Sequence, residues 1–241
     1  MPSTQSGAGA ILWDFDGTLA HRPGMWRGCL IETLDEYEAG HAVSADDLVP
    51  FLRNGFPWHT PEVAHPELST PKAWWDRIEA LLARAFGEVG VAPARARELA
   101  RFAHARYIDG RSGWVLFDDS RPVLTHLRER GWRHVVLSNH VPELEGIVVC
   151  LGLDDLLDAV VTSAMTGYEK PHPEAFAAGR HAAGGADTVW MVGDNVEADV
   201  AGAEAVWIPA ILVRSKHYSP RRAASLSEVI PLLESSGQGC R

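Results

Sequence analysis

Trp13-Asp14-Phe15-Asp16-Gly17-Thr18-Leu19 is the stretch around which the chain is organised. The apolar residues 10–13 that lead into it predict a fully buried β-strand, because such strands are continuous hydrophobic runs. In an extended chain, residues i and i+2 point to the same side, so Asp14 and Asp16 face one site. The Gly-Thr pair that follows lets the backbone turn and leaves amides free to bind an anion.

Two carboxylates this close repel each other, so the pair calls for a cation, an intervening proton or a reactive role. A polar strand end with an Asp-Gly turn is common, and alone it indicates structure as readily as function. Three later segments fit the same site and favour function. They are Leu137-Ser138-Asn139, Lys170 within residues 167–173, and Gly193-Asp194-Asn195 followed by Asp199.

The four segments together resemble the motifs of the haloacid dehalogenase superfamily, whose members are mostly Mg²⁺-dependent phosphohydrolases. They stand in the family's order and run from Asp14 to Asp199, so the resemblance covers nearly the whole chain. It implies a Rossmann-like α/β core with an inserted helical cap in the position called type 1. One departure is Trp207, where relatives often carry glycine, and it concerns packing before a strand rather than chemistry.

Composition and charge exclude several other classes of protein. A chain that is 46% hydrophobic and 22% charged suits a soluble globular fold, and no apolar run is long enough to cross a bilayer. Residues 1–9 lack the basic and apolar regions of a signal peptide, which predicts a cytoplasmic protein. A net charge of -10 argues against a nucleic-acid or membrane-surface partner, although a bound cation can reverse the sign locally for a small anionic substrate. The three cysteines are widely separated and lack metal-type spacing, which predicts reduced thiols: Cys29, Cys150 and Cys240.

An all-helical insertion without strands is predicted for residues 21–109. Helices are expected over residues 25–37, over residues 45–52 after the N-cap Ser44, from Thr70-Pro71 and from Pro93. Four prolines argue against regular structure between residues 54 and 71, and the glycine-containing residues 109–113 predict a flexible linker. The domain prediction is a core of residues 1–20 and 110–241 with a helical cap of residues 21–109.

From residue 114 onward, apolar runs alternate with helical segments, as a parallel sheet requires. The predicted fold is therefore α/β, a doubly wound Rossmann-like sheet with helices on both faces. Active groups of such sheets lie beyond the carboxyl ends of the strands, where each motif falls. A frayed end is expected over residues 235–241. Strands are predicted over residues 10–13, 134–137, 159–162, 188–192 and 210–213.

Phosphoryl transfer needs a nucleophile, positive charge around the phosphoryl oxygens and a proton for the leaving group. Asp14 suits the nucleophile of an aspartyl-phosphate mechanism, and Asp16 suits the general acid and base. The family resemblance assigns the same roles to these positions. Ser138 and Asn139 would bind the phosphoryl oxygens through the hydroxyl and a backbone amide. Lys170 would bind both the phosphoryl group and Asp14, screening their repulsion.

The metal prediction combines Asp14, Asp194 and the backbone carbonyl of Asp16, a hard oxygen set that favours Mg²⁺. Three interpretations of Asp199 stay open: it could bind a metal-bound water, pair with Lys170 or cap the helix that begins there.

Substrate selection is expected to fall to the cap. Polar and aromatic side chains recognise sugars and nucleosides, although a surface or core position is the commoner outcome for any single one of them. The candidate lining residues are His21, Arg22, Trp26, Arg53, Trp58 and His59.

The sequence thus predicts a cytoplasmic Mg²⁺-dependent phosphomonoesterase acting on a small phosphorylated metabolite, of either the sugar phosphate or the nucleotide class. A phosphomutase on the same scaffold, which returns the phosphoryl group to a sugar instead of to water, is the nearest alternative. Its mark would be a cap that excludes water. A dehalogenase is disfavoured, since halide displacement needs neither a metal nor the proton that Asp16 supplies. A catalytically silent binding module is disfavoured because no catalytic position is lost. The oligomeric state stays open.

Overall fold

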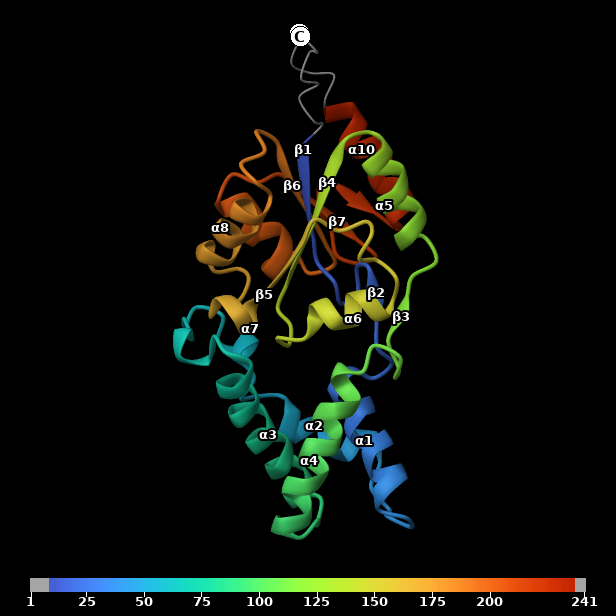
Figure 1. Ribbon diagram of the computed structural model, residues 1–241, viewed down its shortest axis with the longest axis vertical. Helices are drawn as coiled ribbons and strands as arrows, with labels where there is room; N and C mark the ends of the chain where they lie inside the picture. The colour runs from blue at the N-terminus through green and yellow to red at the C-terminus, as the bar shows by residue number, and fades with distance from the viewer. Residues whose placement is uncertain (1–8, 237–241) are drawn as a thin grey trace.

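The computed structural model of the chain describes residues 9–236. Residues 1–8, where no signal peptide is expected, and Cys240 lie outside the described residues, as do residues 237–241 of the predicted frayed end. Figure 1 shows an elongated molecule with a twisted sheet in its upper part and four helices, α1 to α4, in its lower part. Within the described part of the chain, no helix is long and apolar enough to span a membrane.

The upper part is built on a six-stranded parallel sheet in the order β5-β4-β1-β6-β7-β8. The chain enters at the central strand β1, adds β4 and β5 on one side and then continues with β6, β7 and β8 on the other. The five predicted strands are confirmed, and the edge strand β8 is new because two residues are too short to show a pattern. The strands are β1 Gly9–Trp13, β4 Trp132–Ser138, β5 Ala159–Thr162, β6 Val189–Gly193, β7 Ala210–Val213 and β8 Arg222–Ala223.

Alternate residues of β1 enter two separate hydrophobic clusters, as the two-residue period of a strand requires. Ile11 and Trp13 lie in one cluster with side chains of α5, α6 and α10, whereas Ala10 and Leu12 lie in the other with side chains of α8 and α9. In Figure 1, α5 and α10 cover one face of the sheet and α8 covers the opposite face, so the doubly wound prediction is confirmed. The helical segments of this part are α5 Ser120–Glu129, α6 Leu144–Cys150, α7 Ser163–Thr166, α8 Pro173–Ala182, η3 Val196–Ala201, α9 Gly202–Ala205, η4 Leu226–Glu228 and α10 Val229–Ser236.

A buried histidine ties β1, β4 and α5 together. The indole Nε1 of Trp13 donates to Nδ1 of His134 at 3.0 Å, and Nε2 of His134 lies 3.0 Å from the carbonyl oxygen of Leu124. The ring must therefore accept at Nδ1 and donate at Nε2, which is the neutral tautomer. Burial lowers the pKa of His134 to about 4, which keeps the ring neutral at physiological pH.

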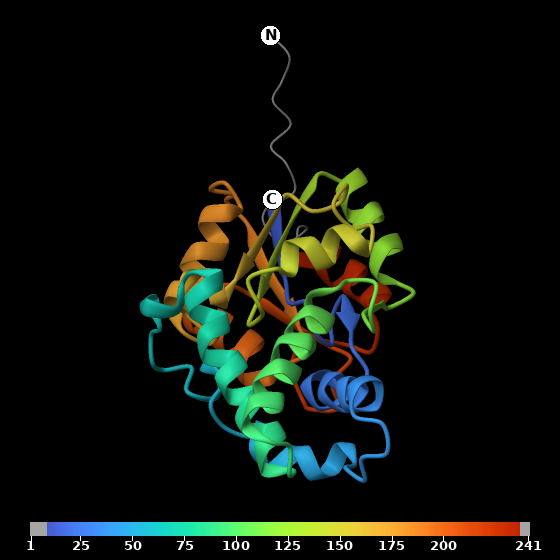
Figure 2. The ribbon, with the colours of Figure 1, turned by 60° about the horizontal axis from the view of Figure 1, so that its bottom comes forward.

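Four helices form the lower part of the molecule, and each begins where the sequence predicts (Figures 1 and 2). Ser44 caps the second of them in a capping box: its Oγ accepts from the amide of Asp47, and the Asp47 carboxylate accepts from the amide of Ser44. Thr70 Oγ1 accepts from the amide of Ala73 at the start of the third. The helices are α1 Met25–Tyr37, α2 Ala45–Leu52, α3 Pro71–Glu88 and α4 Pro93–Ile108.

Two stretches are more regular than the sequence predicts. The proline-rich residues 54–71 contain two 3₁₀ turns, η1 Pro57–His59 and η2 Pro66–Leu68, because proline at the first position suits a short helical turn. Where no strand was expected, β2 Ala20–His21 pairs antiparallel with β3 Val115–Leu116. This small ladder joins the two places where the chain passes between the upper and lower parts.

The expected flexible linker at residues 109–113 is packed more closely than predicted. Gly110 is buried, and a Cβ atom added to it would lie 2.5 Å from Cβ of Cys150 on α6. The chain therefore needs glycine at position 110 for close approach rather than for flexibility alone.

Trp207 lies on the surface, before β7. Its backbone adopts a φ of 61°, in the left-handed region that favours glycine, and its side chain is 91% exposed. The tryptophan at this position, where relatives often carry glycine, therefore affects the surface and the local backbone rather than the residues of the four motifs.

A candidate active site at the carboxyl ends of three strands

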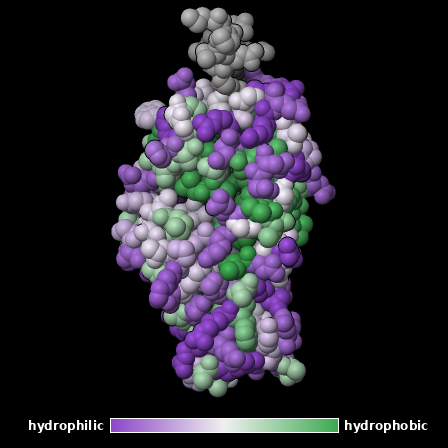
Figure 3. Space-filling view, viewed as in Figure 1, coloured by the Kyte–Doolittle hydropathy of each residue, from purple (hydrophilic) through white to green (hydrophobic). Residues whose placement is uncertain are grey.

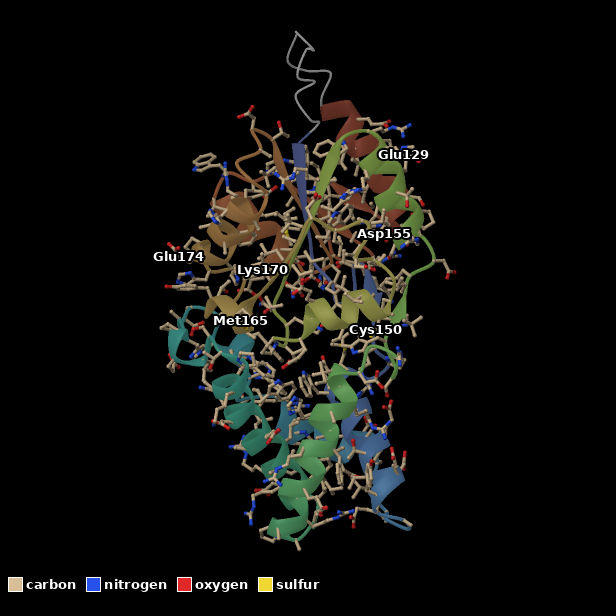
Figure 4. The ribbon with its side chains drawn as sticks, in the orientation of Figure 1. Glu129, Cys150, Asp155, Met165, Lys170 and Glu174 are labelled. Atoms are coloured by element: carbon tan, nitrogen blue, oxygen red, sulfur yellow. The ribbon has the colours of Figure 1, made fainter. Side chains whose placement is uncertain are left out.

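The four sequence motifs converge at one edge of the sheet. Trp13 at the end of β1 is paired with Val136 of β4 and Val192 of β6, so the residues that follow these strands are brought side by side. A cavity of about 880 Å³ lies there, between the sheet and the lower helices. Lys170 lies at this level in Figure 4, above α3. All seven predicted site residues line the cavity: Asp14, Asp16, Ser138, Asn139, Lys170, Asp194 and Asp199.

Lys170 is fixed between two carboxylates. Its Nζ donates to Oδ1 of Asp14 at 2.8 Å and to Oδ1 of Asp199 at 2.5 Å, and all three side chains are buried. Burial alone would lower the pKa of Lys170, but the charges of Asp14 and Asp199 raise it above its ordinary value. Ser138 Oγ donates to the same Oδ1 of Asp14 at 3.0 Å. One carboxylate oxygen of Asp14 is thus fixed by two donors, which orients the other.

Asn139 holds the Lys170 loop in place. Its Nδ2 donates to the carbonyl oxygen of Lys170 at 2.9 Å, and its Oδ1 accepts from the amide of Lys170 at 2.7 Å. Both ends of the side-chain amide are therefore engaged by the main chain of the lysine. A contact between Asn139 and phosphate, which the sequence predicts, would have to come from its own main chain.

Three carboxylates form a cluster that fits a hard divalent cation. Ligand oxygens of Asp14, Asp194 and Asp199 lie within 4.8 Å of one another. Burial raises the pKa of Asp194 to about 7, and the charges of Asp14 and Asp199 add to the shift, so a cation would relieve a real repulsion. Gly17 leaves room for this arrangement, because a Cβ atom there would lie 2.3 Å from Oδ2 of Asp194.

The cluster also narrows the open question about Asp199. Its Oδ1 pairs with Lys170, and its Oδ2 accepts from the amide of Asn195 at 3.0 Å, where the helical segment η3 begins. Two of its three possible roles, the lysine partner and the helix cap, are therefore present together. Its place in the acidic cluster keeps the third, a contact with metal-bound water, available.

Asp16 sits beside this cluster in the cavity wall. Its side chain is 24% exposed, and within residues 9–236 its Oδ1 has no hydrogen-bond partner. Burial raises the pKa of Asp16 well above its ordinary value, and the charges of Asp14 and Asp194 raise it further. A carboxyl group whose pKa is raised holds its proton more readily, which suits a general acid.

Among the cavity residues that the sequence did not single out are Tyr107 and His140. The ring of Tyr107 stacks on Trp26 with centroids 3.7 Å apart and also lines the cavity. His140 directly follows Asn139 and places Nε2 3.7 Å from Oδ2 of Asp16. The signal in the sequence that could have identified His140 is its position just beyond the end of β4.

The predicted substrate-lining residues divide into two groups. Trp26, Arg53, Trp58 and His59 line the cavity. The cavity lining does not include His21 or Arg22, so the prediction is wrong for these two. His21 lies against Phe117 with ring centroids 4.8 Å apart, and the fully buried Arg22 side chain binds Glu32 at 2.5 Å. His21 belongs to β2 and Arg22 directly follows it, so the pairing of β2 with β3 fixes the backbone on which both side chains stand.

A family model of haloacid dehalogenase-like hydrolases matches residues 8–206 of the chain. The chain is 30% identical over 183 residues to haloacid dehalogenase-like hydrolase domain-containing protein 3 of Bos taurus, covering 68% of this chain and 69% of that protein. It is 34% identical over 151 residues to a phosphoserine phosphatase of Thermus thermophilus, covering 61% of this chain and 59% of that protein. The crystal structure of a 2-haloacid dehalogenase from Pseudomonas syringae matches with a TM-score of 0.67 at 21% identity, covering 95% of this chain and 99% of that one, which shows a shared fold.

Proposed function

Because the chain belongs to the haloacid dehalogenase-like hydrolase family, we propose that this enzyme is a Mg²⁺-dependent phosphatase acting on a small phosphorylated metabolite. The observation that carries the proposal is the pairing of two different carboxyl groups in one cavity. Asp14 is fixed by Lys170 and Ser138, as a carboxylate nucleophile requires. Asp16 has a raised pKa, as a general acid requires.

In the first step, Asp14 attacks the phosphorus atom with the oxygen that Lys170 and Ser138 leave free. The bond from phosphorus to the leaving oxygen breaks as the Asp14–phosphorus bond forms, and Asp16 gives its proton to the departing alkoxide. Lys170 and the Ser138 hydroxyl, which both donate to Asp14, would stabilise the equatorial phosphoryl oxygens.

In the second step, Asp16 is a carboxylate and takes a proton from the water that attacks the aspartyl-phosphate. Asp14 and phosphate are released, and Asp16 is protonated again for the next turnover. The return of the proton to its starting place closes the cycle.

The residues that would hold Mg²⁺ are Asp14, Asp194 and the backbone carbonyl of Asp16, with Asp199 close to the same place. When bound, the ion supplies positive charge beside the transferring phosphoryl group. The oxygen-only donor set and the raised pKa of Asp194 support this assignment.

Two observations support the proposed substrate class. The Thermus thermophilus relative is named a phosphoserine phosphatase, which acts on a small phosphorylated molecule. The cap contributes aromatic and basic side chains to the cavity, among them Trp58, Arg53 and His59, which suit the ring or hydroxyl groups of a sugar phosphate or a nucleotide.

The test is a screen of phosphorylated metabolites for released phosphate, with Mg²⁺ or with EDTA. We expect Mg²⁺-dependent release by the wild type and a loss of more than about 10³-fold in Asp14→Asn, which lacks the nucleophile. Asp118→Asn, on the exposed turn before α5, is the matched control and should stay active. Release of halide instead of phosphate, or full activity of Asp14→Asn, would contradict the proposal. Faster discharge of the phospho-enzyme by a sugar phosphate than by water would identify a mutase.

A further inference from the structure

His140 is a buried histidine whose ring has no hydrogen-bonding side-chain partner among residues 9–236. It is 2% exposed, and neither Nδ1 nor Nε2 has a hydrogen bond of good geometry there, although the backbone of Val141 lies close enough to act on the pKa of the ring. Leaving a buried polar atom without a partner costs about 1–3 kcal/mol. Oδ2 of Asp16 lies 3.7 Å from Nε2, just beyond hydrogen-bond distance. The ring and the proposed general acid are therefore neighbours that are not joined by a hydrogen bond.

Aromatic side chains hold the ring in this place. Phe15 meets it edge-on with centroids 5.6 Å apart, Trp114 lies at 5.2 Å and Tyr107 at 6.1 Å. These three come from the loop after β1, the segment before β3 and the helix α4, so both parts of the molecule contribute. Burial lowers the pKa of His140 to about 3, so the ring is neutral and offers one N–H donor and one acceptor nitrogen.

Packing alone does not explain a histidine at this position. A phenylalanine would fill the same aromatic pocket and would leave no buried polar atom unpartnered. An imidazole is explained if a second state of the site gives it a partner. Asp16 is the group within reach, because a movement of about 0.7 Å would bring Nε2 and Oδ2 to hydrogen-bond distance.

We propose that His140 is a positioning residue: its Nε2–H donates to Oδ2 of Asp16 in the reacting state and orients the carboxyl group towards the leaving group. This inference rests on the proposed phosphatase function, because it acts through Asp16. In the first step the proton passes from the Asp16 carboxyl group to the leaving oxygen, while His140 keeps its own proton throughout. The same hydrogen bond then holds the carboxylate in line with the attacking water.

Three substitutions separate positioning from packing. His140→Phe keeps a ring but removes the donor. His140→Gln places an amide N–H close to the former Nε2, whereas His140→Asn places one close to the former Nδ1, on the wrong side. If the hydrogen bond to Asp16 matters, activity should follow the order wild type, Gln, then Asn and Phe.

The measurements use an alkyl phosphate that the wild type hydrolyses and p-nitrophenyl phosphate. For the alkyl substrate, we expect kcat of His140→Phe to fall about 10- to 100-fold with KM little changed, which is less than the 10²- to 10⁴-fold typical of losing the general acid itself, because Asp16 is retained. With p-nitrophenyl phosphate, whose leaving group needs little protonation, the first step should survive and the second should slow. His140→Phe should then release a burst of about one p-nitrophenolate per molecule, and phosphorylated Asp14 should appear by intact-protein mass spectrometry after acid quench.

Several outcomes would overturn the inference. A p-nitrophenolate burst that slows as much as kcat on the alkyl substrate would mean that the pocket is distorted and that His140 is structural. Wild-type kinetics in His140→Phe would mean that the ring does not act on Asp16. If His140→Phe does not fold, the Gln and Asn pair decides, and equal activity of these two would contradict the proposal. Absence of phosphate release by the wild type would instead overturn the proposed function, and the inference with it.

Discussion

At the scale of single residues, the site is governed by the balance of charge around one buried lysine. Asp14 and Asp199 share Lys170, whereas Asp194 has no lysine or arginine partner among the described residues and carries a raised pKa. Buried carboxylates that outnumber the cations beside them repel each other, and a divalent cation is the simplest remedy. The chemistry of the site therefore depends on side chains whose charges are set by their neighbours.

Asp194→Asn tests the proposed metal site. The amide keeps the shape of the side chain but removes one negative ligand, so the concentration of Mg²⁺ for half-maximal phosphatase activity should rise by at least about 10-fold. Circular dichroism should show an unchanged fold. Asp187→Asn, on an exposed loop, is the control with the same change of charge. An identical Mg²⁺ titration for Asp194→Asn and the wild type would remove Asp194 from the metal site.

His134 should make the protein sensitive to acid. The pKa of this buried ring is about 4 in the folded state and about 6.5 when unfolded, so between these values only the unfolded chain takes up the proton. The contribution of the neutral His134 ring to the free energy of unfolding is therefore fully present above pH 6.5. It is lost as the pH falls towards 4, and the loss amounts to roughly 3 kcal/mol.

Urea unfolding at pH 7.5, 6 and 5 measures the effect. His134→Gln cannot titrate, so the free energy of unfolding should fall less steeply with acid than in the wild type, although the variant is less stable at pH 7.5. Comparing the two proteins isolates His134, because the buried carboxyls that titrate in the same range are common to both. Parallel pH profiles would show that His134 does not contribute.

At the scale of elements, two glycines show how context decides the role of a residue. Gly110, between α4 and β3, approaches Cβ of Cys150 so closely that a methyl group there would collide with α6. For Gly87, in the last turn of α3, no other part of residues 9–236 beyond its chain neighbours and the helix's own backbone comes within 4 Å of the position that a Cβ would take. One glycine is required by packing, and the other only weakens a helix.

Replacing each of these glycines by alanine should therefore have opposite effects. Gly110→Ala must displace α6 or the linker, and we expect a loss of about 1–3 kcal/mol in the free energy of unfolding. Gly87→Ala should gain roughly 0.5–1 kcal/mol through helix propensity. Thermal melting of both variants beside the wild type gives the comparison. A stable Gly110→Ala would show that residues 109–113 form the loose linker that the sequence predicts.

At the scale of the whole molecule, the cavity lies between two parts that share one hydrophobic cluster. That cluster runs from Ile11 of the sheet through Phe15 and Trp114 to the helices of the lower part. Figure 3 shows that the surface of the lower end is mainly hydrophilic, whereas hydrophobic residues gather nearer the middle and over the upper part.

We propose that residues 21–109 move as a unit against the rest, opening and closing the cavity over the substrate.

Limited proteolysis tests this division. Arg111 is exposed in the linker beside the buried Gly110, so trypsin should cut first after Arg111. Mg²⁺ with a phosphate analogue should slow that cut, because a closed cap restricts the linker. Arg111→Gln removes the site and serves as the control. First cleavage at Arg77 or Arg84 inside α3 would mean that the lower helices open before the linker does.

The sequence by itself determined the elements and the place of the chemistry. Four helices and five strands are encoded by local signals, such as the capping box at Ser44 and the apolar run before Asp14. Local signals suffice because a helix or strand depends on neighbours only a few residues away. The motif residues could be placed together because the carboxyl ends of parallel strands meet at one edge of a sheet. The two-residue strands β2 and β8 were not predicted, since two residues are too few to show an alternating pattern.

Only the tertiary structure decided which side chains meet across the cavity. The side chain of Asn139 binds the main chain of Lys170, 31 residues away, a contact that no pattern in the sequence indicated. Arg22 was expected to face substrate and is instead buried against Glu32, and His140 gained significance only when the fold placed it beside Asp16. Such contacts depend on how far each element is rotated and how closely the two parts pack. Those quantities are fixed by the sum of many distant contacts, and no periodicity along the chain records them.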